Sequence, residues 1–153
     1  MIPFVGTFIH AMDRKGRTNV PAKHREIMKL ANATHLILIR GFDGCLFLLP
    51  PSTWEKFQAR FEREEFQSER EARYFERLML HDADVQKPDA QGRIQINQGL
   101  RDFASLEREV LIYGANTRIE LWSPRLFQEY QASGKKSSGT IEELASSYFR
   151  HRD

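Results

Sequence analysis

The sequence of 153 residues has little cysteine and no long apolar run. Its single cysteine, Cys45, can form no internal disulfide, which is typical of a protein in the reducing cytoplasm. Cys45 lies in the apolar run of residues 45–49, which indicates a buried packing residue rather than a reactive thiol. No apolar stretch approaches the roughly 18 residues that span a bilayer, so we expect no membrane partner.

The sequence also lacks the motifs of common catalytic and cofactor sites. It contains no Gly-rich phosphate loop, no Cys-x-x-Cys and no Gly-x-Ser-x-Gly, and its histidines show no His-x-x-x-His spacing. The run His81-Asp82-Ala83-Asp84 could be imagined as a metal cluster, but it is more typical of a solvated helix end. We therefore interpret the chain as a non-enzyme, with no catalytic residue, metal, cofactor or small-molecule substrate.

The net charge of +2 is small, but the charges are unevenly distributed. Lysine and arginine outnumber acidic residues in residues 1–30, whereas acidic residues outnumber basic ones in residues 61–85. A basic end could hold an anion while the acidic middle keeps it away. The alternative interpretation is two solvated faces without a ligand.

An internal repeat organises the chain. Residues 13–25 and 89–101 share Asp-x-x-Gly-Arg, followed by a later arginine, at one fixed offset. The corresponding residues are Asp13 and Asp89, Gly16 and Gly92, Arg17 and Arg93, Val20 and Ile96, and Arg25 and Arg101. After a three-residue shortening, residues 38–41 match 111–114, residues 46–48 match 119–121, and Pro51 and Trp54 match Pro124 and Phe127. Two collinear segments with one small deletion indicate a motif present twice.

Each copy is expected to begin with a β-hairpin. Its aspartate can accept hydrogen bonds from backbone N–H groups two or three residues on, and its glycine supplies the positive φ of a three-residue loop. The arginine then starts the returning strand beside the turn. A helix is expected after Pro21, followed by a second hairpin. Its strands are predicted at residues 36–39 and 45–49 in the first copy, and at 110–112 and 118–122 in the second.

Outside the hairpins, the sequence predicts helices and one linker. Apolar stripes at residues 54–61 and 75–79 predict two helices between the copies. Residues 133–139 are rich in Gly, Ser and Lys, which predicts a flexible linker. Thr140-x-x-Glu143 is a capping box for a short helix carrying Ile141, Leu144, Ala145 and Tyr148. Such a helix is unstable alone and is expected to dock, for example on a neighbouring subunit.

In combination, these motifs resemble the MraZ family. The resemblance rests on the paired Asp-x-x-x-Arg elements, on the loop before Val20-Pro-Ala, and on two further runs. These runs are Arg40-Gly-x-Asp-Gly-Cys-Leu and Tyr113-Gly-x-Asn-x-Arg-Ile-Glu-Leu-Trp. The similarity extends from Gly6 to about Tyr130.

The resemblance implies an α+β fold with two tandem AbrB-like β-hairpin motifs. The motifs would form one pseudo-two-fold swapped-hairpin barrel, akin to AbrB and MazE, with helices after each motif. We expect the first motif at residues 7–54, connecting helices at 55–82, the second motif at 83–126, and a C-terminal helix and tail at 127–153.

The resemblance also implies a sequence-specific DNA-binding regulator of transcription. Such a protein would be cytoplasmic and nucleoid-associated. It would bind short direct repeats in double-stranded DNA upstream of the division and cell-wall gene cluster, as a ring-shaped homo-oligomer. The alternative function is an antitoxin-like interaction module that uses its C-terminal tail.

The DNA-binding residues are expected in the two turns. Arg14, Lys15 and Arg17 would meet phosphates and base edges, together with Lys23 and Arg93. The turns themselves would be set by Asp13, Gly16, Asp89 and Gly92. In the alternative reading, Arg17 and Arg93 only pair with the aspartates of their own turns. Arg25 and Arg101, within helical segments, are expected to serve structure.

The two copies differ in ways that predict unequal sites. The second turn carries Ala90-Gln91 where the first carries Arg14-Lys15, so it is less basic. The second copy also has Asn97 after Ile96, where the family usually has a proline. We therefore expect the first turn to contribute more to DNA binding.

Overall fold

The computed structural model describes residues 2–61 and 66–149. The elements are β1 (Phe4–Ala11), β2 (Arg17–Asn19), α1 (Ala22–Leu30), β3 (Leu36–Arg40), β4 (Leu46–Leu49), α2 (Pro51–Phe61), α3 (Glu69–Leu80), β5 (Asp84–Gln86), β6 (Arg93–Gln95), α4 (Gln98–Phe103), β7 (Glu109–Asn116), β8 (Arg118–Trp122), α5 (Pro124–Ser138) and α6 (Ile141–Phe149). Residues 62–65, which include three glutamates, and the end of the tail, 150–153, lie outside this description. None of the described helices has the length and apolarity needed to cross a membrane.

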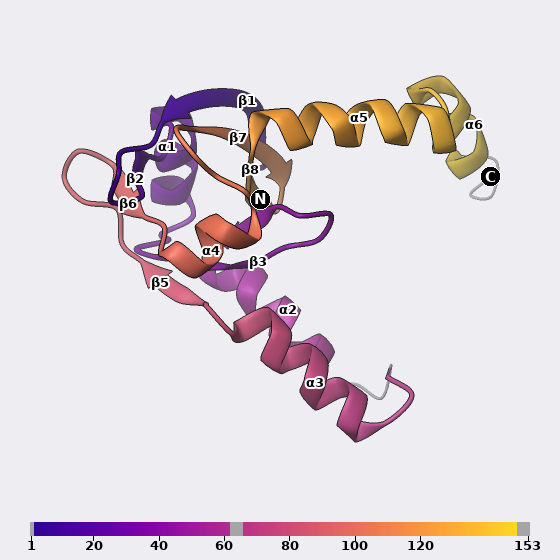
Figure 1. Ribbon diagram of the computed structural model, residues 1–153, viewed down its shortest axis with the longest axis horizontal. Coiled ribbons are helices and arrows are strands. Elements are labelled where there is room, and N and C mark those ends of the chain that lie inside the picture. The colour runs from indigo at the N-terminus through magenta and orange to yellow at the C-terminus, as the bar shows by residue number, and fades with distance from the viewer. Residues whose placement is uncertain (1, 62–65, 150–153) are drawn as a thin grey trace.

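The two copies share one antiparallel sheet (Figure 1). Its strand order is β1-β7-β8-β4-β3-β5, and a separate ribbon pairs β2 with β6. The first strand of each copy pairs with the second hairpin of the other copy, because β1 lies beside β7 and β5 lies beside β3. The α+β class and both second hairpins, β3–β4 and β7–β8, are as expected.

The first hairpin and the barrel differ from expectation. The turn after β1 forms, but β2 pairs with β6 of the other copy, with Thr18 opposite Ile94. Two side-chain hydrogen bonds join β2 back to β1: Oγ1 of Thr18 donates to the carbonyl of Ala11, and Nδ1 of His10 lies 2.8 Å from the carbonyl oxygen of Asn19. Within the described residues, β1 and β5 are the two edges of the sheet and do not pair with each other. The described strands therefore form no closed barrel.

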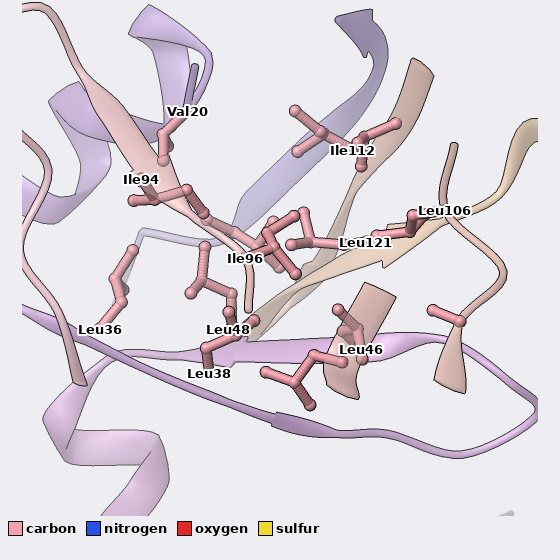
Figure 2. Packing of buried hydrophobic residues seen from close by; sticks show 14 of the residues in the cluster. Val20, Leu36, Leu38, Leu46, Leu48, Ile94, Ile96, Leu106, Ile112 and Leu121 are labelled. Carbon is pink, nitrogen blue, oxygen red and sulfur yellow. The ribbon is translucent and has the colours of Figure 1, made fainter. Parts of the chain in front are cut away.

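The central strands β3, β4, β7 and β8 are buried on both faces of the sheet, which explains their unbroken apolar runs. Leu36 and Leu38 face a core under the β2·β6 ribbon, where Ile94 and Ile96 pack toward the sheet (Figure 2). Ile37, between them in the chain, faces a second core that is covered by α2, α3 and α5. The chain thus places α2, α3 and α5 on one face of the sheet, and the ribbon with α1 and α4 on the other.

The strand register corrects the alignment of the two copies. Leu36 and Leu38 face the same core as Val110 and Ile112. Leu36 pairs with Gln86, and Val110 pairs with His10, the counterpart of Gln86 in the first segment of the repeat. Leu38 therefore corresponds to Ile112, one residue beyond the match that sequence alone suggests. The three-residue shortening of the second copy is therefore divided between the segment before its second hairpin and the turn of that hairpin.

The predicted linker is also wrong, because α5 continues through it to Ser138. The helix ends at Gly139, whose φ of 97° is left-handed and whose N–H donates to the carbonyl of Lys135. A helical glycine such as Gly134 costs only about 1 kcal/mol relative to alanine, so it does not stop the helix. The predicted cap is confirmed in its first half, since the N–H of Glu143 donates to Oγ1 of Thr140 at 3.3 Å, while the Glu143 carboxylate accepts from the Thr140 hydroxyl.

One buried histidine gives the fold an expected pH dependence. His24 on α1 is fully buried between the rings of Phe4 and Phe8, and neither ring nitrogen has a hydrogen-bond partner. Burial, with smaller contributions from the charges of Lys23 and His10, lowers its pKa to about 4. The fold therefore requires the neutral ring.

We expect the free energy of unfolding to fall as the pH is lowered from about 6.5 towards 4, because the unfolded state takes up the proton first. The loss should be at most about 3 kcal/mol, and His24→Leu should remove most of it. Urea unfolding at several pH values measures this effect, with His81→Ala, a change at an exposed histidine, as control. An unchanged pH profile in His24→Leu would contradict the assignment.

Candidate nucleic-acid interface

The first turn is built around the carboxylate of Asp13. Its Oδ1 accepts hydrogen bonds from the backbone N–H groups of Lys15 and Arg17, both at 2.9 Å, and its Oδ2 accepts from Nε of Arg17 at 2.7 Å. Gly16 has a φ of 82° and donates its N–H to the carbonyl of Asp13. One side chain thus fixes both the backbone of the turn and the guanidinium of Arg17.

The second turn repeats this geometry. Oδ1 of Asp89 accepts from the N–H groups of Gln91 and Arg93, both at 2.9 Å, and Oδ2 accepts from Nε of Arg93 at 2.9 Å. Gly92 has a φ of 81°. The two Asp-x-x-Gly-Arg segments therefore have the same local structure, as the repeat predicts.

The two aspartates keep their negative charge. Hydrogen bonds from the backbone N–H of Arg17, and then from its side chain, lower the pKa of Asp13. The pKa of Asp89 is lowered chiefly by the backbone N–H of Arg93. Each carboxylate offsets part of the positive charge of its own turn, so the first turn keeps an excess through Arg14 and Lys15.

The β2·β6 ribbon brings the two turns together. Nδ2 of Asn19 donates to the carbonyl of Gln91, and Nε2 of Gln95 donates to the carbonyl of Lys15, both at 2.9 Å. Asn19 and Gln95 occupy equivalent positions of the repeat, so each copy holds the turn of the other. Sequence reasoning missed both residues, although a side-chain amide at the same place in both copies was a usable signal.

Two arginines on helices also contact the two turns. Arg25 of α1 donates from Nε to the carbonyl of Val20 and packs against Gly92. Arg101 of α4 donates from Nη1 to the carbonyl of Arg14 and packs against Gly16. Each contacts the turn of the other copy, which fits the structural role expected for them.

The cations of the turns point to solvent. The side chains of Arg14 and Lys15 are exposed and form no ion pair with any residue in the described part of the chain. The side chain of Arg17 is 41% exposed, and only its Nε is engaged by Asp13. Arg93 has the same arrangement with Asp89. The outer Nη groups of both guanidinium ions are therefore available to an anion or to a base edge.

Lys23 is exposed in the first turn of α1. This helix starts just after Val20, whose N–H donates to the carbonyl of Gly92 at 2.8 Å. The start of α1 thus adjoins the second turn, which is the less basic one. The second copy begins its helix differently, because Oδ1 of Asn97 accepts from the N–H of Leu100 where the first copy has Pro21.

The acidic run near the end of α3 is engaged in the fold. Asp82 forms an ion pair with Arg40 at 2.8 Å, and Asp84 accepts from the side chain of Gln86 at 2.7 Å. Over residues 2–61 and 66–149, no group of three or more His, Cys, Asp or Glu residues is arranged to hold a metal ion.

The same two-copy organisation is recognised by comparison with known proteins. The sequence model of the MraZ protein family, described as antitoxin-like, matches residues 4–78 and again residues 79–146. The chain belongs to the MraZ family.

Curated members of the MraZ family match nearly the full chain. A protein named transcriptional regulator MraZ from Natranaerobius thermophilus is 35% identical over 140 residues, which cover 92% of this chain and 94% of the relative. Its namesake from Alkaliphilus oremlandii is 36% identical over 90% of this chain and 93% of its own length. The protein of that name from Lactiplantibacillus plantarum is 34% identical over 93% of this chain and 95% of its own.

Proposed function

We propose that this chain is a sequence-specific DNA-binding regulator of transcription, and that its two turns are the DNA-contacting surface. The observation that carries the proposal is the pair of turns with the same hydrogen-bond geometry, joined by the β2·β6 ribbon, each presenting an arginine held by an aspartate. The names of the related MraZ proteins support the same function.

Each cation has a distinct role in this proposal. Arg14, Lys15 and Lys23 neutralise phosphates, which provides affinity that falls as salt rises. Arg17 and Arg93 use their outer Nη groups on base edges, where an arginine can grip guanine O6 and N7 with two bonds. The Nε–carboxylate bond holds each guanidinium in one orientation before DNA arrives, so less side-chain entropy is lost on binding.

We further propose that the chain acts as a ring-shaped homo-oligomer on short direct repeats upstream of the division and cell-wall gene cluster. One turn with three cations binds DNA weakly at cellular salt. Repeated subunits on repeated sites multiply weak contacts through effective concentration. This tandem arrangement would place the protein on the nucleoid in the cytoplasm.

The test is fluorescence anisotropy on a duplex from the region upstream of the chain's own gene, compared with a shuffled duplex over a range of salt concentrations. Tighter binding to the upstream duplex supports the proposal, and equal binding to both contradicts it. Arg125, an exposed residue of α5 that pairs with Glu129, provides a control substitution, Arg125→Ala, on a helix that projects away from the ribbon (Figure 1).

In this assay, Arg93→Ala is expected to weaken binding by less than about tenfold, or about 1.4 kcal/mol. The turn of Arg93 lacks the two neighbouring cations of the first turn, so we expect it to contribute fewer phosphate contacts and less affinity for DNA. The titration curve of Arg93→Ala gives this value directly. A loss as large from Arg125→Ala would show that the effect is not specific to the turns.

A further inference from the structure

Helices α5 and α6 form an arm that leaves the body of the protein (Figure 1). The start of α5 is anchored, because Phe127 and Tyr130 pack on Trp122 with ring centroids 5.3 and 5.1 Å apart. Beyond Tyr130, α5 continues for about two turns to Ser138, and neither α5 nor α6 contains a buried residue. The arm therefore carries α6 away from the sheet.

The tip of the arm exposes apolar side chains. Ile141 is 83% exposed and Leu144, which lies on the same side of α6, is 50% exposed. The first turn of the helix is acidic, with Glu142 and Glu143. Helices of nine residues are marginal in water, so α6 gains stability when this apolar side is covered.

An apolar groove with basic residues, complementary to the apolar and acidic side chains of α6, lies between α2 and the turns of the second hairpins. Its volume is about 310 Å³, and its apolar lining includes Phe42, Phe47 and Phe57. Its rim is basic, with Lys56, Arg60 and Arg118. Arg118 lies over the ring of Phe47 and pairs with Glu120, whereas Lys56 and Arg60 are exposed and form no ion pair within residues 2–61 and 66–149.

We propose that α6 of one copy docks in this groove of a second copy. Ile141 and Leu144 would cover the phenylalanines, and Glu142 and Glu143 would face Lys56 and Arg60. The groove of the same chain is not available to α6, because the unbroken α5 directs the arm away from the body. Every copy has one arm and one groove, so the contact can repeat from subunit to subunit and close a ring. The inference rests on the ring assembly in the proposed function and assigns its interface.

Charge reversal with mixing tests the docking without DNA. Lys56→Glu/Arg60→Glu reverses the groove, and Glu142→Lys/Glu143→Lys reverses the arm. All four residues are exposed, so the body of the fold should survive. Glu143 also belongs to the N-terminal cap of α6, so Glu142→Lys alone, which leaves that cap intact, serves as a second arm variant. Light scattering should show that each variant is dissociated at concentrations where the unchanged chain is assembled. The association constant of each variant should be at least about tenfold lower than that of the unchanged chain. An equimolar mixture of the two variants should reassemble, because each reversed arm then meets a reversed groove.

Failure of the mixture to reassemble would overturn the pairing, and so would variants that stay assembled when alone. A chain that is monomeric at all concentrations would overturn both the docking and the ring. DNA contact by the turns is tested separately, by the arginine variants of β2 and β6, so loss of the interface and loss of the DNA-binding proposal are distinguishable.

Disulfide trapping identifies which copy supplies the arm. The double variant Lys56→Cys/Glu142→Cys should give covalent dimers and larger species on a non-reducing gel, whereas each single variant should not. The native Cys45 does not interfere, because it is fully buried and burial raises the pKa of its thiol. A fast-migrating monomer with an internal disulfide would overturn docking between copies, and so would the absence of any cross-link.

Discussion

Replacing Arg17 by alanine is expected to remove most of the DNA binding while leaving the free energy of unfolding nearly unchanged. The side chain makes one ion pair, with Asp13, and is 41% exposed. Such exposed pairs contribute at most about 1 kcal/mol. The backbone of the turn is held by Oδ1 of Asp13, which the substitution does not touch. Thermal unfolding and light scattering should therefore match the unchanged chain.

The expected loss of affinity is about a hundredfold or more. An arginine that reads a base contributes about 1–3 kcal/mol of discrimination. The same loss recurs in every subunit that engages a tandem site, so the effects compound. If Arg17 reads a base, discrimination between upstream and shuffled DNA falls. If it contacts only phosphate, affinity falls equally on both duplexes and the salt dependence becomes shallower.

Two further variants separate charge from geometry and the first turn from the second. Arg17→Lys retains the charge but not the planar, two-pronged donor, so it should restore phosphate binding without discrimination. Arg93→Ala should have the smaller effect. If Arg93→Ala weakens binding while Arg17→Ala does not, the first turn is not the dominant contact. If neither weakens binding, the arginines serve only to stabilise their turns.

The sequence predicts the turns well because they depend on local chemistry. An aspartate, a glycine and an arginine at fixed spacing specify the same hydrogen bonds in both copies. The partner of the strand that follows is not a local property. The strands β2 and β6 have only three residues each, and their pairing with one another depends on how both copies fold together.

The register error and the linker error also have physical causes. Strands β3 and β7 are buried on both faces, so their apolar runs lack the alternation that would fix a one-residue shift. In α5, glycine and serine suggested a linker, but nothing before Gly139 imposes a backbone that a helix cannot accept. Composition alone did not separate a tolerated glycine from one that ends a helix.

The candidate site could be predicted as separate turns but not as one surface. The basic residues of the first turn and the arginine of the second are visible in the sequence. The amides of Asn19 and Gln95, which join the turns, become informative only once β2 and β6 are known to pair. The further roles of Arg25 and Arg101 likewise depend on contacts between the copies.

Three glycines with positive φ offer a graded test of how tightly the turns are built. Gly44, with a φ of 86°, has open space where a β-carbon would lie. At Gly92, with a φ of 81°, a β-carbon would meet the guanidino end of Arg25, a side chain that can move. At Gly16, with a φ of 82°, it would overlap the backbone oxygen of Ile96, which cannot move without disturbing β6.

We expect alanine at these positions to lower the free energy of unfolding in the order Gly44, Gly92, Gly16. Gly44→Ala should cost only the strain of a left-handed alanine, about 1–2 kcal/mol. Gly92→Ala should cost slightly more, because Arg25 must shift. Gly16→Ala should cost about 4 kcal/mol or more, since the overlap with Ile96 also strains the bond from the Ile96 N–H to the Gly16 carbonyl, 2.8 Å long. Urea unfolding of the three variants measures the order. Equal losses at Gly16 and Gly44 would mean that the first turn is not clamped against β6, and that the two turns do not form one rigid surface.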